Sequence, residues 1–256
     1  MAEITISDEK IYYINGESFD TGNPTILMLH GAGQSSGTWK YQLALLSGLK
    51  THNLIIPDLP GHGSSEGHGR RTVEEYTDFI TVLIERLNLS NLIITGHSMG
   101  AAIAMLYTLR RPENVSACVL TGAGARLKVA PKSLETAKNS YKLFCEAASE
   151  RMIAEGSAQK IKDDFKAGML SIRHEVCYND LLACDEFDIM EEVSRITVPT
   201  LILSATEDIL TPVKYGEYLH SAIRNSDFHI IPGSGHFMMQ EQYGQFNRIL
   251  SEFLDL

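Results

Sequence analysis

The sequence has no excess of basic residues and no long apolar run. Its 256 residues carry 22 Lys and Arg against 32 Asp and Glu, a formal net charge of −10 with neutral histidines. Proteins that bind nucleic acid usually present a basic face to the phosphates, so this charge balance argues against a nucleic-acid partner. The longest apolar run, about 101–106, is far shorter than the roughly 18–20 residues that a membrane-spanning helix requires. We therefore expect no nucleic-acid partner and no membrane span.

Cysteine is also scarce. The four thiols form no Cys-x-x-Cys pair and have no paired histidine spacing; they are Cys118, Cys145, Cys177 and Cys184. Disulfide frameworks belong to much smaller secreted chains, and residues 1–10 lack the basic and apolar regions of a signal peptide. These features predict reduced thiols and a cytoplasmic location. No cysteine lies in a glycine-rich turn beside a candidate base, so a thiol nucleophile is not expected.

Patterns for metal and dinucleotide binding are missing too. The nine histidines include no His-Glu-x-x-His, and no carboxylate cluster accompanies them. The glycines at 31–33 and 122–124 do not form a Gly-x-Gly-x-x-Gly turn. We therefore expect no metal and no organic cofactor.

What the sequence does contain is an alternation of short apolar runs with amphipathic segments. Strands are predicted at 25–30, 53–57, 92–96, 117–121, 200–204 and 227–231, and helices at 36–47, 72–87, 99–110, 213–223 and 240–254. Two further short runs, 4–6 and 11–14, indicate an antiparallel hairpin at one edge. Because runs such as ILML and LIIT are apolar at every position, their strands are expected to be covered on both sides. The fold class is therefore predicted to be α/β, with a mostly parallel central sheet and helices on both faces.

Residues 128–195 interrupt this alternation. They contain no convincing strand, and apolar residues at helical spacing mark one face along 134–148 and another along 161–169. The tail of this segment, 180–192, holds six acidic residues and no basic one. We predict a core made of 1–127 and 196–256, with 128–195 inserted as a helical cap over the end of the sheet. A helical elaboration packed elsewhere is the alternative.

Gly96-His97-Ser98-Met99-Gly100 is the first sequence feature that points to chemistry. This Gly-x-Ser-x-Gly follows an apolar run and opens a helical pattern, the strand–turn–helix context that a nucleophilic serine requires. On so sharp a turn the serine takes a strained backbone conformation, and side chains two positions away would collide. The helix that follows directs free N–H groups toward charge that develops near Ser98 Oγ. Ser98 is therefore the candidate nucleophile.

The remaining catalytic candidates follow three other predicted strands. His30-Gly31-Ala32-Gly33 comes after the first parallel strand, where the Ala32 N–H and the Met99 N–H could bind an oxyanion together. Asp208 and His236 each lie in a loop after a later strand, at the sheet end where open α/β folds place their sites. In a Ser–His–acid relay, His236 takes the proton of Ser98 and the carboxylate holds the imidazole tautomer. The chain order is Ser, Asp, His.

These segments, with Pro57-Asp58-Leu59-Pro60-Gly61-His62-Gly63-Ser64-Ser65, resemble the α/β-hydrolase superfamily over nearly the whole chain, in its branch of small esterases, lactonases and carbon–carbon hydrolases. The resemblance implies Ser98 as nucleophile, Asp208 as acid, His236 as base, and Ala32 and Met99 as the oxyanion hole, under a cap at 128–195. Glu207 is a second acid beside Asp208, but the Asp-x-x-x-Pro spacing of the family fits Asp208. Family members commonly carry Glu-x-Pro after the histidine; here Glu241 lacks that proline.

A serine nucleophile narrows the reaction that the resemblance implies. Haloalkane dehalogenases and epoxide hydrolases of this superfamily use an aspartate at that position, so both are disfavoured. We expect a hydrolase that cleaves a small or medium carboxylic ester of a small-molecule acyl substrate, with lactones, thioesters or carbon–carbon bonds as alternatives. A small-molecule receptor that keeps its triad is the alternative of another class, with 180–192 as a partner surface. His30, His62 and His97 are expected to make local hydrogen bonds, and the oligomeric state is left open.

Overall fold

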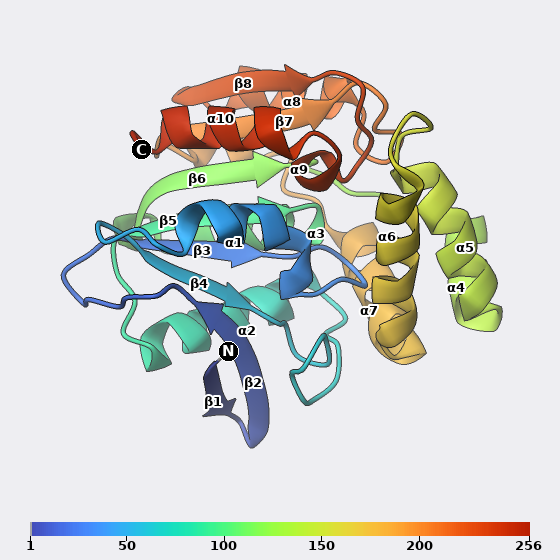
Figure 1. The fold of residues 1–256 in the computed structure, drawn as a ribbon, viewed down its shortest axis with the longest axis horizontal. Helices are drawn as coiled ribbons and strands as arrows, with labels where there is room; N and C mark the ends of the chain where they lie inside the picture. The colour runs from blue at the N-terminus through green and yellow to red at the C-terminus, as the bar shows by residue number, and fades with distance from the viewer. Residues whose placement is uncertain (1) are drawn as a thin grey trace.

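The computed structural model describes residues 2–256 and contains one eight-stranded sheet with the order β1-β2-β4-β3-β5-β6-β7-β8 (Figure 1). The strands are β1 (Ala2–Ile6), β2 (Glu9–Asn15), β3 (Thr25–Leu29), β4 (Asn53–Pro57), β5 (Leu92–His97), β6 (Val115–Thr121), β7 (Thr200–Ala205) and β8 (Ser226–Ile231). The β1–β2 hairpin is antiparallel and β2 pairs antiparallel with β4, whereas the six strands from β4 across to β8 run parallel. The predicted α/β fold with a mostly parallel sheet is confirmed.

Helices cover both faces of this sheet. They are α1 (Lys40–Leu46), α2 (Val73–Arg86), α3 (Met99–Arg110), α8 (Val213–Ala222), α9 (Met238–Glu241) and α10 (Tyr243–Phe253). In β3, Leu27 belongs to the core cluster that includes α2, α3 and α8, while its neighbour Ile26 belongs to the cluster that includes α1 and α10. Successive side chains of a strand point to opposite faces, so a strand covered on both sides must be apolar throughout. This requirement explains the unbroken apolar runs.

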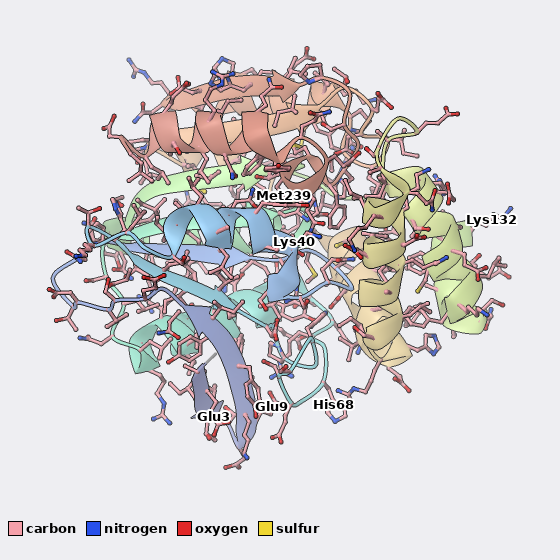
Figure 2. The ribbon with its side chains drawn as sticks, viewed as in Figure 1. Glu3, Glu9, Lys40, His68, Lys132 and Met239 are labelled. Carbon is pink, nitrogen blue, oxygen red and sulfur yellow. The ribbon has the colours of Figure 1, made fainter. Side chains whose placement is uncertain are left out.

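The segment between β6 and β7 is helical, as predicted. It forms α4 (Pro131–Asn139), α5 (Tyr141–Met152), α6 (Gln159–Ser171) and α7 (His174–Glu186). Figure 1 shows these four helices grouped beyond the arrowheads of β3, β6 and β8, at the carboxyl end of the parallel strands. The outer side of this group is charged, and Lys132 on α4 points away from the protein (Figure 2). The division into a core of 1–127 and 196–256 and a cap of 128–195 stays a prediction.

Three predicted elements differ in detail from the structure. The face expected along 134–148 is divided between α4 and α5, because Ser140 leaves the helical conformation at φ −150°. The predicted helix 36–47 begins as a 3₁₀ turn, Ser36–Trp39, which the Ser35 side chain caps. The predicted helix 240–254 is interrupted at Gln242. Each of these differences depends on backbone hydrogen bonds at the end of a helix. The spacing of hydrophobic residues does not indicate such bonds.

Two further features concern membrane-spanning helices and the state of the cysteines. None of the helices within residues 2–256 is long and apolar enough to cross a membrane. The four cysteines are buried and carry free thiols.

Candidate active site

Ser98 lies on the turn between β5 and α3, in a backbone conformation that L-residues rarely adopt. Its φ is +53° and its ψ is −116°. The flanking glycines permit this turn: a Cβ at Gly96 would lie 2.2 Å from the Gly100 carbonyl oxygen, and a Cβ at Gly100 would lie 2.3 Å from the Leu29 carbonyl oxygen. The turn therefore closes only because α3 touches the backbone of β3 and β5 directly, and this contact fixes the strained serine at the carboxyl end of β5.

Replacing Gly100 by alanine is expected to lower the free energy of unfolding by about 3 kcal/mol, because the added methyl overlaps the backbone of β3. Gly168 in α6 is a matched control, since a Cβ there meets no atom within 4 Å. Gly168→Ala should stabilise the protein by about 0.5–1 kcal/mol through helix propensity. Urea denaturation of both variants measures the difference, and equal free energies of unfolding would contradict the expected overlap.

The turn after β3 presses against the Ser98 turn. A Cβ at Gly31 would lie 3.0 Å from His97 Nδ1 and 3.3 Å from Ser98 Cβ, so no side chain fits between the two turns. Within residues 2–256, neither the Ala32 N–H nor the Met99 N–H donates a hydrogen bond to a protein acceptor. Both amides belong to turns that adjoin Ser98, and the Met99 amide is also at the positive end of the α3 dipole. The arrangement suits an anionic oxygen bound beside the serine.

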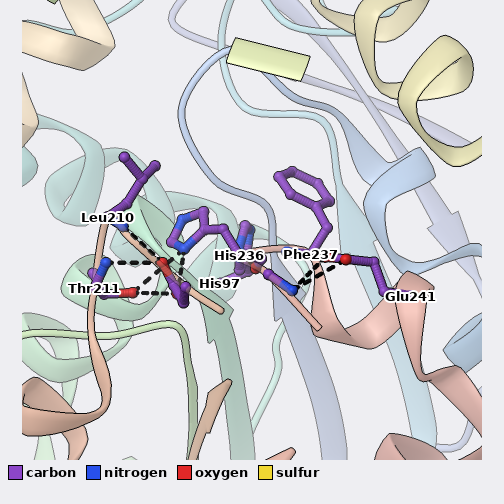
Figure 3. Close-up of polar contacts among 8 residues, drawn as sticks. His97, Leu210, Thr211, His236, Phe237 and Glu241 are labelled. Carbon is purple, nitrogen blue, oxygen red and sulfur yellow. Dashed lines mark hydrogen bonds and ion pairs between the residues drawn. The ribbon is translucent and has the colours of Figure 1, made fainter. Parts of the chain in front are cut away.

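Asp208 and His236 are joined by a hydrogen bond. His236 Nδ1 lies 2.7 Å from Asp208 Oδ2, and both side chains are almost fully buried. Asp208 Oδ1 accepts from the Leu210 and Thr211 amides at 2.9 Å each, and Oδ2 also accepts from Thr211 Oγ1 at 2.7 Å (Figure 3). Burial raises the pKa of the Asp208 carboxyl, but attraction to His236 and these hydrogen bonds outweigh burial, so the pKa is lowered. Glu207, the neighbouring acid, is exposed.

The His236 imidazole is enclosed by backbone and by a second histidine. A Cβ at Gly122, where φ is +54°, would lie 3.1 Å from the His236 ring, and the His97 ring is centred 4.6 Å away. His97 Nε2 lies 2.9 Å from the His236 carbonyl oxygen, so His97 ties the serine turn to the histidine loop. Burial and the nearby His236 hold the pKa of His97 well below its usual range, so His97 is a neutral donor.

No hydrogen bond joins Ser98 to His236, although His97 connects the turn of the one to the loop of the other. Within residues 2–256, His236 Nε2 is buried and has no partner, and Ser98 Oγ makes no hydrogen bond to it. Contacts of this kind commonly tighten only when substrate binds. The structure thus joins Asp208 to His236, places Ala32, Met99 and Ser98 on adjoining turns, and leaves the serine–histidine bond unformed.

Glu241 has a larger role than the sequence indicated. Its carboxylate accepts hydrogen bonds from the Gly235 and Phe237 amides on either side of His236, each at 3.1 Å (Figure 3). The same carboxylate accepts from the Ala154 amide at 2.8 Å and from Ser157 Oγ at 2.7 Å, both in the α5–α6 loop. The acid therefore holds the histidine loop against the helical insertion.

His30 and His62 form a second buried pair beneath the Ala32 turn, with ring centres 4.9 Å apart. His30 Nε2 accepts from the Leu59 amide and His30 Nδ1 donates to the Gly31 oxygen, which together require a neutral ring. Burial, together with repulsion from His62, lowers the pKa of His30 to about 4. Both nitrogens of His62 face acceptors, the Pro60 oxygen at 3.1 Å and Asp180 Oδ2 at 2.7 Å. Burial opposes the charged ring of His62, but attraction to Asp180 prevails and its pKa is raised.

Acidification from pH 6.5 to 4 is expected to weaken the fold through His30. Because the folded ring stays neutral down to about pH 4 while the unfolded ring takes a proton near pH 6.5, His30 should remove about 3 kcal/mol of unfolding free energy over this window. His62 acts in the opposite direction, since its raised pKa adds stability below pH 6.5 that is lost as the pH rises through the folded value. Denaturation curves of wild type and His30→Gln at four pH values isolate the His30 contribution. Identical pH slopes in the two proteins would contradict it.

The chain matches the family model described as alpha/beta hydrolase fold over residues 24–242. A solved thermophilic esterase is 31% identical, with a TM-score of 0.86 over 99% of this chain and 96% of its own. The 2-hydroxy-6-oxononadienedioate/2-hydroxy-6-oxononatrienedioate hydrolase of Cupriavidus pinatubonensis is 27% identical over 98% of this chain and 94% of its own length. The Karrikin insensitive 2 receptor CA of Petunia hybrida is 21% identical over 80% of this chain and 82% of its own.

Proposed function

The chain belongs to the α/β-hydrolase fold family, and we propose that it is a serine hydrolase that cleaves a small or medium carboxylic ester through an acyl-enzyme. The observation that carries the proposal is the buried Asp208–His236 pair, 2.7 Å apart, next to a serine on a strained turn. In this proposal Ser98 is the nucleophile, His236 the general base, Asp208 the acid, and the Ala32 and Met99 amides the oxyanion hole. Residues 128–195 are the cap over the substrate.

The reaction proceeds in two halves. His236 Nε2 takes the proton of Ser98 Oγ as the oxygen attacks the ester carbonyl, and the Ala32 and Met99 amides stabilise the negative oxygen that forms. The tetrahedral intermediate collapses, the C–O bond to the alcohol breaks, and His236 gives its proton to the leaving alkoxide. A water molecule, deprotonated by His236, then attacks the acyl-enzyme; the acid is released and Ser98 regains its proton. Asp208 keeps His236 Nδ1 protonated and stabilises the imidazolium.

The relatives support ester cleavage and keep neighbouring reactions in view. The solved structure at 31% identity is described as an esterase, and the Cupriavidus relative is named a 2-hydroxy-6-oxononadienedioate/2-hydroxy-6-oxononatrienedioate hydrolase. Lactones, thioesters and carbon–carbon bonds are alternatives for the same triad, because the serine chemistry is common to all of them. The petunia relative, named a receptor, favours a second candidate: a small-molecule receptor that keeps a reactive serine. No nucleic acid, metal or organic cofactor enters either proposal.

A substrate panel with an active-site label separates these candidates. The purified protein is assayed with nitrophenyl esters of increasing acyl length, with lactones and with thioesters, and Ser98→Ala is the control. A serine-directed phosphonate is expected to label one residue, mapped to Ser98, and nitrophenyl esters are expected to turn over many times per protein molecule. Stoichiometric labelling without turnover would contradict the proposal of an enzyme and favour the receptor. If lactones or thioesters were turned over faster than any open-chain oxygen ester, they would be the substrate class in place of the proposed carboxylic esters.

A further inference from the structure

Asp180 on α7 is a buried acid that the proposed reaction does not use. Its side chain has no exposed surface, although the other acids of 180–192 are half-buried or exposed. Three donors from the core surround it: Oδ2 accepts from the Gly33 amide at 2.8 Å and from His62 Nε2 at 2.7 Å, and Oδ1 accepts from the Tyr76 hydroxyl. A carboxylate is costly to bury unless such partners compensate for lost water. Asp180 thus connects the insertion to the core.

The Gly33 amide is a significant point of attachment because it adjoins Ala32. The Ala32–Gly33 peptide is the centre of a tight turn in which the Gln34 amide donates to the Gly31 oxygen at 3.3 Å and Gly33 has φ +65°. On the other side of Ala32, the Gly31 oxygen also accepts from His30 Nδ1 at 2.9 Å. The peptide that carries the Ala32 N–H is therefore held by His30 through its own Gly31 oxygen, and the next peptide is held by Asp180 through the Gly33 amide.

Packing reinforces this link between the insertion and the turn. A Cβ at Gly33 would lie 2.9 Å from Cys177 Sγ of α7 and 3.4 Å from Met169 Cε of α6. The opposite side of the same turn abuts the serine, since a Cβ at Gly31 would lie 3.3 Å from Ser98 Cβ. The turn is thus held between the insertion and the nucleophile, and a shift of α7 would move the Ala32 amide relative to Ser98.

From this geometry we propose that Asp180 is a positioning residue: by holding the Gly33 amide from α7, it sets the direction of the Ala32 N–H toward the oxyanion. The proposal rests on the proposed function, because it gives Ala32 its role in the reaction. A donor displaced by about 1 Å can reduce a rate about 10²-fold, and loss of one oxyanion donor costs about 10²–10³-fold in kcat. The insertion then controls turnover as well as access to the site.

The test compares Asp180→Ala with the control Glu175→Gln, which changes an exposed acid on the same helix. The substrate is 4-nitrophenyl acetate, because its acyl group is short and makes few contacts outside the reacting atoms. Active-site titration with a phosphonate counts competent molecules, so kcat is expressed per site. We expect Asp180→Ala to lower kcat about 10²-fold with little change in KM, and Glu175→Gln to match wild type. Asp180→Asn, whose amide oxygen can still accept from Gly33, should lose much less activity than Asp180→Ala.

A fourth variant separates positioning from stability. Asp180→Ala removes the acceptor of three buried donors, His62 Nε2, the Tyr76 hydroxyl and the Gly33 amide, and the protein could then be too unstable to assay. The double variant His62→Leu/Asp180→Leu removes both buried charges, and apolar replacement of an ion pair is often neutral for stability. It should regain part of the melting temperature lost in Asp180→Ala, although the Tyr76 hydroxyl and the Gly33 amide still lack an acceptor. Its kcat should stay about 10²-fold below wild type, because the Gly33 amide is not held.

Three outcomes would overturn the proposal, and each differs from failure of the proposed function. If wild type does not turn over any ester, the proposed function fails first. If wild type is active but Asp180→Ala or the double variant keeps wild-type kcat per site, only the role of Asp180 fails. A loss confined to KM, or a loss in Asp180→Asn as large as in Asp180→Ala, likewise overturns positioning through the Gly33 amide.

Discussion

Ser98→Ala is expected to lower kcat for a nitrophenyl ester by about 10⁶-fold, because the acyl-enzyme route disappears with the hydroxyl. A residual rate above that in water should remain, since the Ala32 and Met99 amides still stabilise the oxyanion of direct water attack. Steady-state kinetics measure the loss, and mass spectrometry checks that the phosphonate adduct disappears. The fold should survive, because Ser98 Oγ makes no hydrogen bond within residues 2–256.

A contaminating esterase is the main alternative source of weak activity in such a variant. The wild-type and variant proteins should therefore be prepared in parallel and titrated with the phosphonate. If Ser98→Ala retained more than about a hundredth of the wild-type kcat and the residual activity still followed the protein peak, Ser98 would not be the nucleophile.

Asp208→Asn is expected to lower kcat/KM by about 10⁴-fold. The amide nitrogen that replaces Oδ2 favours the wrong tautomer of His236 and does not stabilise the imidazolium, while the Leu210 and Thr211 amides still bond to the remaining oxygen and hold the side chain in place. Stability should change with pH in one direction: the lowered pKa of Asp208 adds stability above its unfolded value near pH 4, and this contribution is lost as the pH falls through the folded value. The asparagine variant should lose that acid-side dependence.

Glu207→Gln is the matched control for Asp208→Asn. It neutralises the adjacent acid, which is exposed, and its backbone amide bonds to the Ser234 oxygen whatever the side chain. We expect its kcat/KM to stay within about twofold of wild type, in line with the small effects of surface substitutions. Comparable losses in the two variants would contradict Asp208 as the acid that orients His236.

The sequence could predict those parts of the molecule whose signal is local. Each parallel strand appears as an apolar run because both of its faces are covered, and the observed bounds of β4 and α3 match those predicted. The serine turn is also marked by a local motif, although only one of its glycines answers to a local contact: Gly96 faces the backbone of Gly100, whereas Gly100 faces the backbone of Leu29 in the distant strand β3. Asp208 and His236 could be nominated because each follows its own strand, but the bond between them depends on the packing of β7 against β8.

Contacts between distant segments could not be predicted in this way. The stretch 180–192 looked like one acidic tail, yet its first acid lies inside the protein and bonds to His62, 118 residues away. His62 was expected to make local hydrogen bonds; it makes one to Pro60, and the bond to Asp180 is not local. Helix α7 lies within the predicted helical insertion, but no helical face was predicted for it, because the polar Asp180 belongs to its buried face and hydrophobic spacing gives no clear pattern there.

The four buried thiols lie in two different parts of the structure, so chemical modification can measure the opening of each part separately. Cys118 is in β6, at the centre of the sheet, whereas Cys145, Cys177 and Cys184 belong to α5 and α7. Burial raises the pKa of every one of these thiols, that of Cys118 to about 12, so none is a reactive thiolate while its surroundings stay closed. The rate at which an alkylating reagent modifies each thiol therefore measures how often its surroundings open. Modification of Cys145, Cys177 and Cys184 alone would show that the inserted helices open without the sheet, whereas modification of Cys118 as well would show that the sheet unfolds with them.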